Sequence, residues 1–287
     1  TRDAFQLNRV AVQSFNYREN LTTADLQANA QTIDNTRRWD PAVILRNYQL
    51  FQGLQTFYKF ADADVDRYVI DGKLRQVLIS ARELNRDDLP SQSWVNRHIV
   101  YTHGFGAVVS PANRASTDGQ PAYTLRDIPP TGAPALTRPE VYFGEALDGY
   151  SLVDAKQDEF NYPRKGQRNA FTRYQGSGGV ELSSLVRRAA FALRFSDINL
   201  LISGQVTDKT RVLFLRSIRD RVRKAAPFLR YDTDPYPVIA NGRLTWVMDG
   251  YTATNMYPYS QSFNGEGGLT GSFNYVRNSV KATIDAY

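Results

Sequence analysis

The two histidines are the first residues whose side chains could do chemistry. His98 and His103 lie five positions apart, within a stretch that we predict to be a β-strand. An odd spacing places two side chains on opposite faces of a strand, so the pair cannot easily share a metal ion. His103 precedes a glycine bend and could act as a general base, but a hydrogen-bonded structural role is commoner for such a histidine. We therefore keep His103 as a candidate catalytic residue and expect it to be structural.

Three alternating aspartates are the second candidate. Asp62, Asp64 and Asp66 resemble the start of a calcium-binding loop, in which carboxylate oxygens hold the cation. The complete pattern needs a glycine at its sixth position and a bidentate glutamate at its twelfth, whereas Arg67 and Tyr68 follow here and a hairpin begins at once. We therefore predict no metal and no cofactor, and we interpret the aspartates as caps at a helix-to-strand connection that pair with arginine.

Five further carboxylates could supply the paired acid and base of a hydrolase. They lie among predicted turns and short strands, at Asp127, Glu140, Glu145, Asp158 and Glu159. The chain contains 28 arginines against seven lysines, and arginine suits planar, bidentate pairing with carboxylates. We therefore expect salt bridges, and keep His103, Glu140, Glu145 and Asp158 as the catalytic candidates to examine.

A glycine-rich stretch, Gly176-Ser177-Gly178-Gly179, precedes a predicted helix and could hold an anion at the N-terminus of that helix. It has no predicted strand directly before it and lacks the lysine of a nucleotide-binding loop, so we interpret it as a tight turn. The chain also has no G-x-S-x-G elbow, no dinucleotide-binding fingerprint and no H-E-x-x-H motif.

Helices must position several of these residues. Asp40 is a good N-cap and Pro41 suits the first helical position, so we predict a helix that ends near Phe60. Residues 1–35 indicate two modest helices, with Leu7, Val10, Ala11, Ser14, Leu26 and Ala30 at helical spacing. A helix over residues 181–195 has one apolar face, made of Leu182, Leu185, Val186, Ala189, Ala190 and Leu193. Another over residues 208–226 has the stripe Val212, Leu215, Ile218 and Val222.

Strands are predicted from turn chemistry and alternation. Asp71-Gly72 and Asn241-Gly242 favour two-residue type I′ turns, and therefore hairpins over residues 68–79 and 237–248. Residues 94–109 predict a strand bent at Gly104-Phe105-Gly106, where we expect a glycine with positive φ and Phe105 in the core. Further strands are predicted at 141–143, 150–153 and 280–284, and long loops at 111–139, 161–179 and 257–271.

The two hairpins share a further pattern. Two aspartates and a tyrosine precede each turn: Asp64, Asp66 and Tyr68 in the first, Asp232, Asp234 and Tyr236 in the second. Common turn chemistry explains the pattern simply. The alternative is a repeated unit, which would give Asp66 and Asp234 equivalent places with similar partners.

The elements together predict an α+β fold of helices and antiparallel hairpins, because regular β-α-β alternation is absent. We expect one large domain or two intimately packed subdomains, with any subdivision near residues 160–180. Hydrophobic residues make up 42% of the 287 residues, which allows a real core.

Composition and charge exclude several classes of protein. The absence of cysteine excludes disulfides, a thiol nucleophile and cysteine-ligated metal centres. No run of apolar residues is long enough to cross a bilayer. The net charge of +6 is spread along the chain, so we predict no nucleic-acid partner.

Seven stretches, taken in order, resemble one known family. They are Asp64-Val65-Asp66-Arg67-Tyr68, Tyr101-Thr102-His103-Gly104-Phe105-Gly106, Asp127-Ile128-Pro129-Pro130, Arg138-Pro139-Glu140-Val141-Tyr142-Phe143-Gly144-Glu145, Ala226-Pro227-Phe228-Leu229, Asp234-Pro235-Tyr236 and Asn274-Tyr275-Val276-Arg277-Asn278-Ser279-Val280-Lys281. Together they are similar to the bacterial uncharacterised protein family 0182, large multi-span membrane proteins of unknown function. The resemblance extends over residues 35–287 and brings no catalytic residue with it.

The resemblance implies that residues 1–287 are a fragment of a soluble extracytoplasmic region, tethered to the cell membrane by transmembrane helices of a longer protein. We expect a non-enzymatic binding or assembly module of the cell envelope. Its expected partners are the protein's own transmembrane region and an envelope ligand or protein. The alternative is an envelope hydrolase that uses acidic residues with His103.

Overall fold

The computed structural model describes residues 22–164, 166–264, 269 and 271–287. It divides into two compact units, Thr1–Thr36 and Arg37–Tyr287. The first unit contains the short helices α2 (Thr23–Ala28) and α3 (Ala30–Ile33). The other residues of the predicted N-terminal helices, Leu7, Val10, Ala11 and Ser14, lie outside the described residues. Within the described part of the chain, every helix is too short or too polar to cross a membrane.

Helix α4 (Pro41–Gln52) begins where the sequence predicts a helix. The Oδ1 of Asp40 accepts hydrogen bonds from the backbone N–H groups of Ala42 (2.8 Å) and Val43 (3.3 Å), which caps the first turn. The helix ends earlier than predicted, because the residues that follow it turn and form strand β1 (Tyr58–Phe60).

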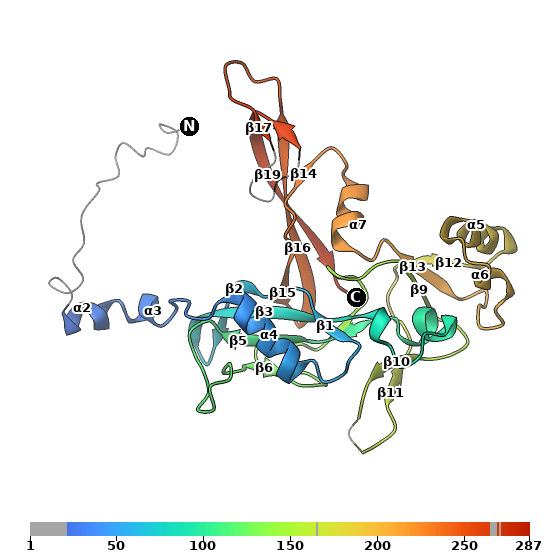
Figure 1. The fold of residues 1–287 in the computed structure, drawn as a ribbon, viewed down its shortest axis with the longest axis horizontal. Helices are drawn as coiled ribbons and strands as arrows, with labels where there is room; N and C mark the ends of the chain where they lie inside the picture. The colour runs from blue at the N-terminus through green and yellow to red at the C-terminus, as the bar shows by residue number, and fades with distance from the viewer. Residues whose placement is uncertain (1–21, 165, 265–268, 270) are drawn as a thin grey trace. The chain divides into compact units, whose positions relative to one another are not determined.

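The first predicted hairpin is present as β2 (Asp64–Ile70) and β3 (Lys73–Leu84). Asp71 and Gly72 have φ values of 51° and 70°, as a type I′ turn requires. β3 is central to a six-stranded antiparallel sheet (Figure 1). It pairs with β1 and β2 along one edge and with β5 along the other, and the sheet continues through the short strands β6 and β7. The bounds of these strands are β5 (Ala107–Pro111), β6 (Leu125–Arg126) and β7 (Thr131–Gly132).

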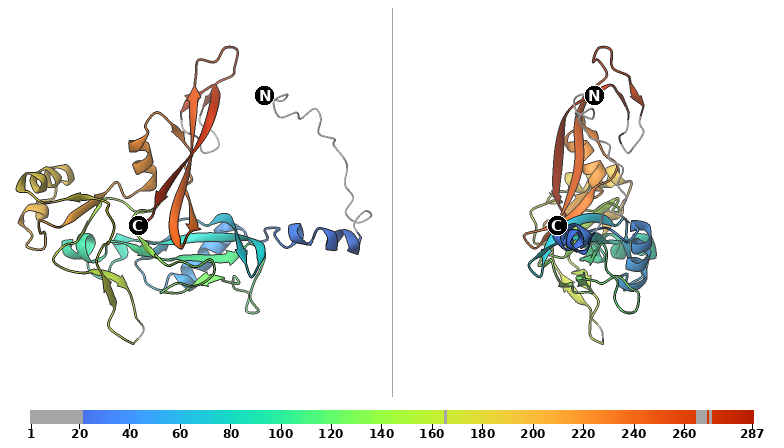
Figure 2. Two further views of the ribbon diagram at one scale, coloured as in Figure 1. Left: turned by 180° about the vertical axis from the view of Figure 1, so that it is seen from behind. Right: turned by 90° about the vertical axis from the view of Figure 1, so that its left-hand side faces the viewer.

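The second predicted hairpin is present as β15 (Tyr236–Ala240) and β16 (Arg243–Thr254), with φ of 52° at Asn241 and 73° at Gly242. β16 also pairs with the terminal strand, and the two form a long ribbon that extends away from the first sheet (Figures 1 and 2). The other strands of this region are β14 (Arg230–Tyr231), β17 (Phe263–Asn264), β18 (Ser272–Phe273) and β19 (Tyr275–Asp285).

The helices α5 (Leu185–Phe195) and α6 (Asn199–Ile202) connect two strands of a third sheet (Figure 1). Its central strand, β13 (Arg211–Phe214), lies between β9 (Tyr150–Val153) and β12 (Val180–Glu181).

The helix predicted over residues 208–226 is therefore wrong in its first half, and only α7 (Ile218–Ala225) is helical. A short apolar run that is buried on both faces fits a strand as well as a helix by its pattern. Val212 and Leu213 are such a run, at 0% and 1% exposure. Leu215 then adopts a φ of 52°, which breaks the chain between strand and helix.

The strand predicted over residues 94–109 is only partly present. Asn96–Val100 forms a π-helical turn, and extended structure begins at β4 (Gly104–Phe105). His98 and His103 therefore lie on different elements rather than on opposite faces of one strand. The bend is as predicted, because Gly106 has a φ of 81° and Phe105 is 2% exposed.

The fold is α+β, as predicted. The loop predicted over residues 111–139 contains the short strands β6 and β7. The loop predicted over residues 161–179 contains β11 (Ala170–Thr172) and the end of β10 (Glu159–Tyr162), and the loop predicted over residues 257–271 contains β17. β8 (Glu140–Val141) lies at the start of the strand predicted over residues 141–143. A 3₁₀ turn, Arg86–Asp88, follows β3. The largest group of buried side chains joins the two hairpins, and in it the indole N–H of Trp246 donates to the carbonyl of Phe143 at 2.9 Å.

Candidate functional site

Three carboxylates meet where the two hairpins lie against each other. Asp62 precedes β2, Asp64 is its first residue, and Asp234 precedes β15. One oxygen from each lies within 4.8 Å of the other two, and we call these residues the carboxylate trio. The sequence pointed to Asp62 and Asp64 together with Asp66, whose Oδ1 instead accepts the backbone N–H of Arg67 (2.7 Å). Asp234 was missed as a partner, although the repeated aspartate pattern before the second turn contains it.

Burial and mutual repulsion set the electrostatics of the trio. Burial, with the nearby carboxylates of Asp62, Asp234 and Glu145, raises the pKa of Asp64 to about 8. Burial also raises the pKa of Asp234, an effect that Arg219 partly opposes. The same arginine forms an ion pair with Glu145. Such a trio can share a proton among its members or hold a cation through hard oxygen ligands.

A narrow hollow beside the trio is closed by a buried glutamate. Glu83 is 1% exposed and accepts the backbone N–H groups of Glu145 (3.0 Å) and Ala146 (2.9 Å). Burial raises the pKa of Glu83 to about 7. The side chains that line the hollow include Asp62, Asp64, Glu83, Glu145 and Trp246. Glu83 is therefore fixed to the backbone and forms a wall of the hollow.

His103 lies in a sealed part of the core. It is 1% exposed, and its ring packs on Tyr142 with the ring centres 4.7 Å apart. Its Nδ1 donates to the carbonyl of Gly104 at 2.9 Å, since a carbonyl oxygen can only accept. Burial lowers the pKa of His103 to about 4. The ring is therefore neutral at pH 7 and has no access to a substrate in this structure.

Glu159 is a second buried acid near this histidine. Its carboxylate accepts hydrogen bonds from the hydroxyl of Thr102, the hydroxyl of Tyr142 (2.9 Å) and the backbone N–H of Tyr174 (2.9 Å). Burial raises the pKa of Glu159 to about 7. With 2% exposure, Glu159 is held as a structural carboxyl group.

The remaining candidate carboxylates are dispersed. Asp158 pairs with Arg173 (2.7 Å), and Asp127 pairs with Arg126 (3.4 Å). Glu140 lies half-buried in β8. None of these contacts joins Glu140 or Asp158 to His103 or to the carboxylate trio.

The glycine-rich stretch contacts the positively charged side chain of Arg211 rather than an anion. The guanidinium of Arg211 donates to the carbonyls of Ser177 (2.7 Å) and Gly178 (2.7 Å). β12 then intervenes, and α5 begins only after Ser184, whose hydroxyl accepts the N–H of Arg187 as an N-cap. The loop therefore presents carbonyl oxygens and does not lie at the N-terminus of a helix.

Sequence reasoning missed that three arginines are buried as structural links. Arg82, Arg86 and Arg216 are 0%, 8% and 1% exposed. Arg216 donates to the carbonyls of Tyr142 (2.9 Å) and Thr102 (2.5 Å) and to the hydroxyl of Ser151 (2.7 Å). Arg86 donates to the same hydroxyl, and Arg82 donates to the carbonyls of Gln52 (2.9 Å) and Phe105 (2.8 Å). These arginines bind main-chain oxygens. The arginine-rich composition alone had suggested carboxylates as their partners.

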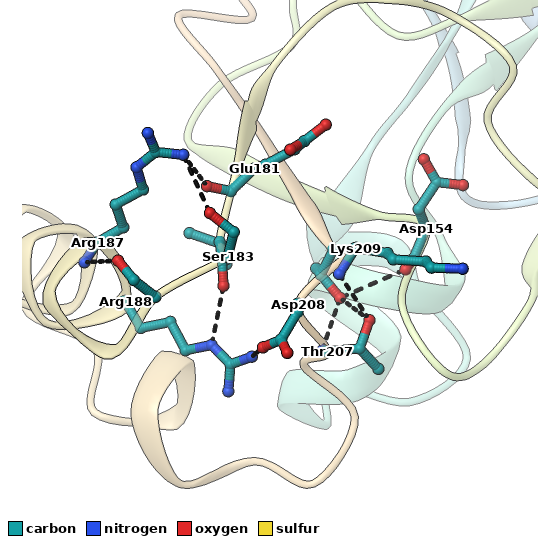
Figure 3. Close-up of polar contacts among 11 residues, drawn as sticks. Asp154, Glu181, Ser183, Arg187, Arg188, Thr207, Asp208 and Lys209 are labelled. Carbon is teal, nitrogen blue, oxygen red and sulfur yellow. Dashed lines mark hydrogen bonds and ion pairs between the residues drawn. The ribbon is translucent and has the colours of Figure 1, made fainter.

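The apolar face predicted on the helix after residue 181 lies in solvent for most of its length. Leu185, Val186 and Leu193 on α5 are 72%, 79% and 84% exposed. Ile198, just before α6, and Ile202, at its end, are 59% and 70% exposed. We call these five residues the aliphatic face. Figure 3 shows the polar contacts at the start of α5, where Arg188 donates to Asp208 and Arg187 to Ser183.

Comparisons with known proteins give one family and many relatives. The sequence model of a family described as "Uncharacterised protein family (UPF0182)" matches residues 1–287. A UPF0182 protein of Pelotomaculum thermopropionicum is 45% identical over 291 residues, covering 100% of this chain and 31% of the relative. Those of Desulforamulus reducens and Moorella thermoacetica are each 44% identical over 292 residues, covering 100% of this chain and 31% and 32% of the relatives. The chain thus spans about a third of the length of these relatives. No solved structure matches it.

Proposed function

The chain belongs to the uncharacterised protein family UPF0182, and from this premise we propose that it is a non-enzymatic binding or assembly module of the cell envelope. In this proposal the module lies outside the cytoplasm and is tethered to the cell membrane by another part of the longer protein. The relatives are about three times as long as this chain, which leaves room for such a tether.

One observation carries the binding role, and it is the exposure of the aliphatic face. A helix that turns leucine and valine to water, while its other side packs on a core, is typical of a surface that another molecule covers. The residues first considered for catalysis support the same conclusion. His103 and Glu159 are sealed in the core, whereas Glu145 and Asp158 pair with arginines.

The carboxylate trio favours a second candidate function, an envelope hydrolase. Asp64 has a raised pKa beside two further carboxylates, which is the arrangement that acid–base chemistry uses. In such an enzyme the trio would supply the acid and the base, because His103 is buried elsewhere in the core.

Labelling of single cysteines in the intact protein in living cells tests the proposed location. The chain has no native cysteine, so Tyr259→Cys introduces one thiol at a fully exposed position of this region. Any cysteine elsewhere in the longer protein is replaced. We expect a membrane-impermeant maleimide to label Tyr259→Cys in intact cells and to label the buried control Ala107→Cys only after denaturation. Labelling of Tyr259→Cys only after lysis would contradict the extracytoplasmic location.

Incubation of the purified chain with isolated cell envelopes separates binding from hydrolysis. We expect the chain to sediment with the envelopes and to release no soluble fragments. Leu193→Glu lowers the sedimented fraction, whereas Leu50→Glu, at a leucine of α4 that is 75% exposed, leaves it unchanged. Release of soluble fragments by the native chain and not by Asp64→Asn would establish the hydrolase instead.

A further inference from the structure

We infer that α5 and α6 dock onto an anionic lipid surface, with the aliphatic face entering the boundary between headgroups and acyl chains. This inference deepens the proposed binding role, because it names the surface that the module binds. It stands on four features of these helices, which are the exposed stripe, the anchoring of the opposite side, the charge of α5 and the kind of side chain that is exposed.

The exposed residues form a stripe along α5. Residues spaced by four lie one above another on a helix, so Leu185, Ala189 and Leu193 share one side, and Val186 and Ala190 flank it. These five residues of α5 are all exposed to solvent. Single exposed leucines are ordinary, but a stripe that runs the length of a helix marks a contact surface.

The opposite side of α5 is anchored, so the helix cannot rotate to bury the stripe. The ring of Phe195 stacks on Tyr150 with centres 4.4 Å apart, and Phe191 packs against Phe214 at 5.6 Å. Arg188 holds the first turn in place, since its Nε donates to the carbonyl of Leu182 (3.1 Å). Its Nη2 also pairs with Asp208 (2.7 Å), as Figure 3 shows. The stripe therefore needs a partner from outside this region if it is to leave water.

The charge of α5 complements anionic headgroups. The helix contains Arg187, Arg188 and Arg194 and no acidic residue. Arg188 is paired with Asp208, so the charge offered to headgroups is that of Arg187 and Arg194. Arg187 stands in the first turn, where the helix dipole is already positive, so a nearby anion would relieve the repulsion. Asp197, which follows the helix, is turned away from the stripe, because its Oδ2 accepts the indole N–H of Trp94 (2.7 Å) and the hydroxyl of Tyr150 (2.5 Å).

The composition of the aliphatic face favours a lipid surface over two alternatives, which are another protein and a second copy of this chain. The centres of protein interfaces are enriched in aromatic side chains, whereas here Phe191 and Phe195 face the core and only aliphatic side chains face outward. A second copy packed on the same face would bring the arginines of both copies together, which repels. A basic helix with an aliphatic stripe instead suits the plane of a membrane interface, where arginine stems lie along acyl chains and guanidinium groups reach the phosphates.

Co-sedimentation of the 287-residue chain with vesicles tests this inference. The vesicles are pure phosphatidylcholine, or phosphatidylcholine with about 30% phosphatidylglycerol, at an ionic strength of about 0.15 M. We expect binding to the anionic vesicles only. Leu185→Glu/Leu193→Glu weakens it at least about tenfold, since two apolar side chains no longer leave water. Arg187→Gln/Arg194→Gln weakens it by about tenfold or more through the loss of charge.

The matched control is Leu50→Glu/Val69→Glu, which adds the same charges at residues that are 75% and 70% exposed on α4 and β2. This control binds anionic vesicles as the native chain does, and all variants keep the native circular dichroism spectrum. Equal binding to neutral vesicles, or unchanged binding by the leucine variant, overturns the inference.

The remaining outcomes separate the inference from the proposed function. A concentration-dependent dimer that Leu193→Glu abolishes would make a second copy the occupant and overturn the lipid assignment. If the chain ignores anionic vesicles but still sediments with isolated envelopes in a manner that Leu193→Glu weakens, the lipid assignment fails and the binding module stands. If it binds neither, both fail.

Discussion

Buried ionisable side chains are the residues at which the stability of this chain depends on pH. Burial raises the pKa of Glu159 to about 7, above its ordinary value of 4.5. The folded state therefore holds a proton that the unfolded state releases first. The contribution of Glu159 to the free energy of unfolding is full below about pH 4.5, falls as the pH rises to about 7, and stays at its reduced value above that.

Glu159→Gln removes this dependence, because glutamine keeps an acceptor for the N–H of Tyr174 and cannot ionise. We expect the variant to gain stability over the native chain as the pH rises, by on the order of 3 kcal/mol in full. Urea unfolding of both proteins at about pH 5 and about pH 8 checks this. His98 and His103, whose pKa values burial lowers to about 4, oppose the trend equally in both proteins. Parallel stability profiles would contradict the assignment.

The bend at residues 104–106 is the second residue-scale feature with a measurable cost. A Cβ on Gly106 would meet Cγ of Pro130 at 2.7 Å, at a φ of +81°. We expect Gly106→Ala to lower the free energy of unfolding by more than about 1 kcal/mol.

Gly72→Ala is the control for this prediction, because Gly72 has a φ of +70° and nothing within 4 Å of an added Cβ. It therefore measures backbone strain alone. We expect chemical denaturation to give a larger loss for Gly106→Ala than for Gly72→Ala. Equal losses would mean that the contact with Pro130 is relieved without cost.

At the scale of elements, local chemistry could be predicted from the sequence and burial could not. Asp40 with Pro41 starts α4, and Asp71-Gly72 and Asn241-Gly242 form their turns, because each depends only on adjacent residues. Residues 211–214 were mistaken for helix because the neighbouring strands that bury β13 on both edges come from distant parts of the chain.

The same limit applies to the candidate site. Two of the three aspartates that the sequence pattern indicates, Asp62 and Asp64, lie in the carboxylate trio, but the partner that completes it lies 170 positions later than Asp64. The aspartate patterns before the two turns do not have similar partners, because Asp234 faces Asp62 and Asp64 whereas Asp66 bonds to the next backbone N–H. The apolar stripe of α5 could be predicted from its helical spacing. Its exposure could not, because only packing decides which side of a helix faces the core.

One hydrogen bond joins the two hairpins, and a substitution that deletes a single hydroxyl group removes it. The hydroxyl of Tyr68 on β2 accepts the backbone N–H of Ile239 on β15 at 2.8 Å. Tyr68→Phe leaves this half-buried donor without its partner, so we expect a loss of about 1–3 kcal/mol in the free energy of unfolding. Urea denaturation measures it, with the fully exposed Tyr259→Phe as a control that changes nothing. An unaltered midpoint for Tyr68→Phe would show that this contact adds nothing to the association of the hairpins.

At the scale of the whole molecule, we expect the net charge of +6 to form no surface for nucleic acid. Arg82, Arg86 and Arg216 are buried and cannot reach a phosphate. Other arginines are occupied by carboxylates across the described surface, as in the pairs Arg173–Asp158 and Arg243–Asp285. Arg187 and Arg194 on α5 could neutralise only a few phosphates, and affinity for a polyanion grows with the number neutralised at once.

We therefore expect the chain to bind short duplex DNA or RNA no more tightly than about 1 µM at an ionic strength of about 0.15 M. Fluorescence anisotropy with labelled duplexes over a range of salt concentrations measures this affinity. The α5 variant Arg187→Gln/Arg194→Gln, which weakens binding to anionic vesicles in the inference above, then leaves the already weak binding to duplexes nearly unchanged. A submicromolar dissociation constant with a steep dependence on salt would mean that dispersed arginines act together on one face. It would replace the lipid surface with a nucleic acid as the natural partner of this charge.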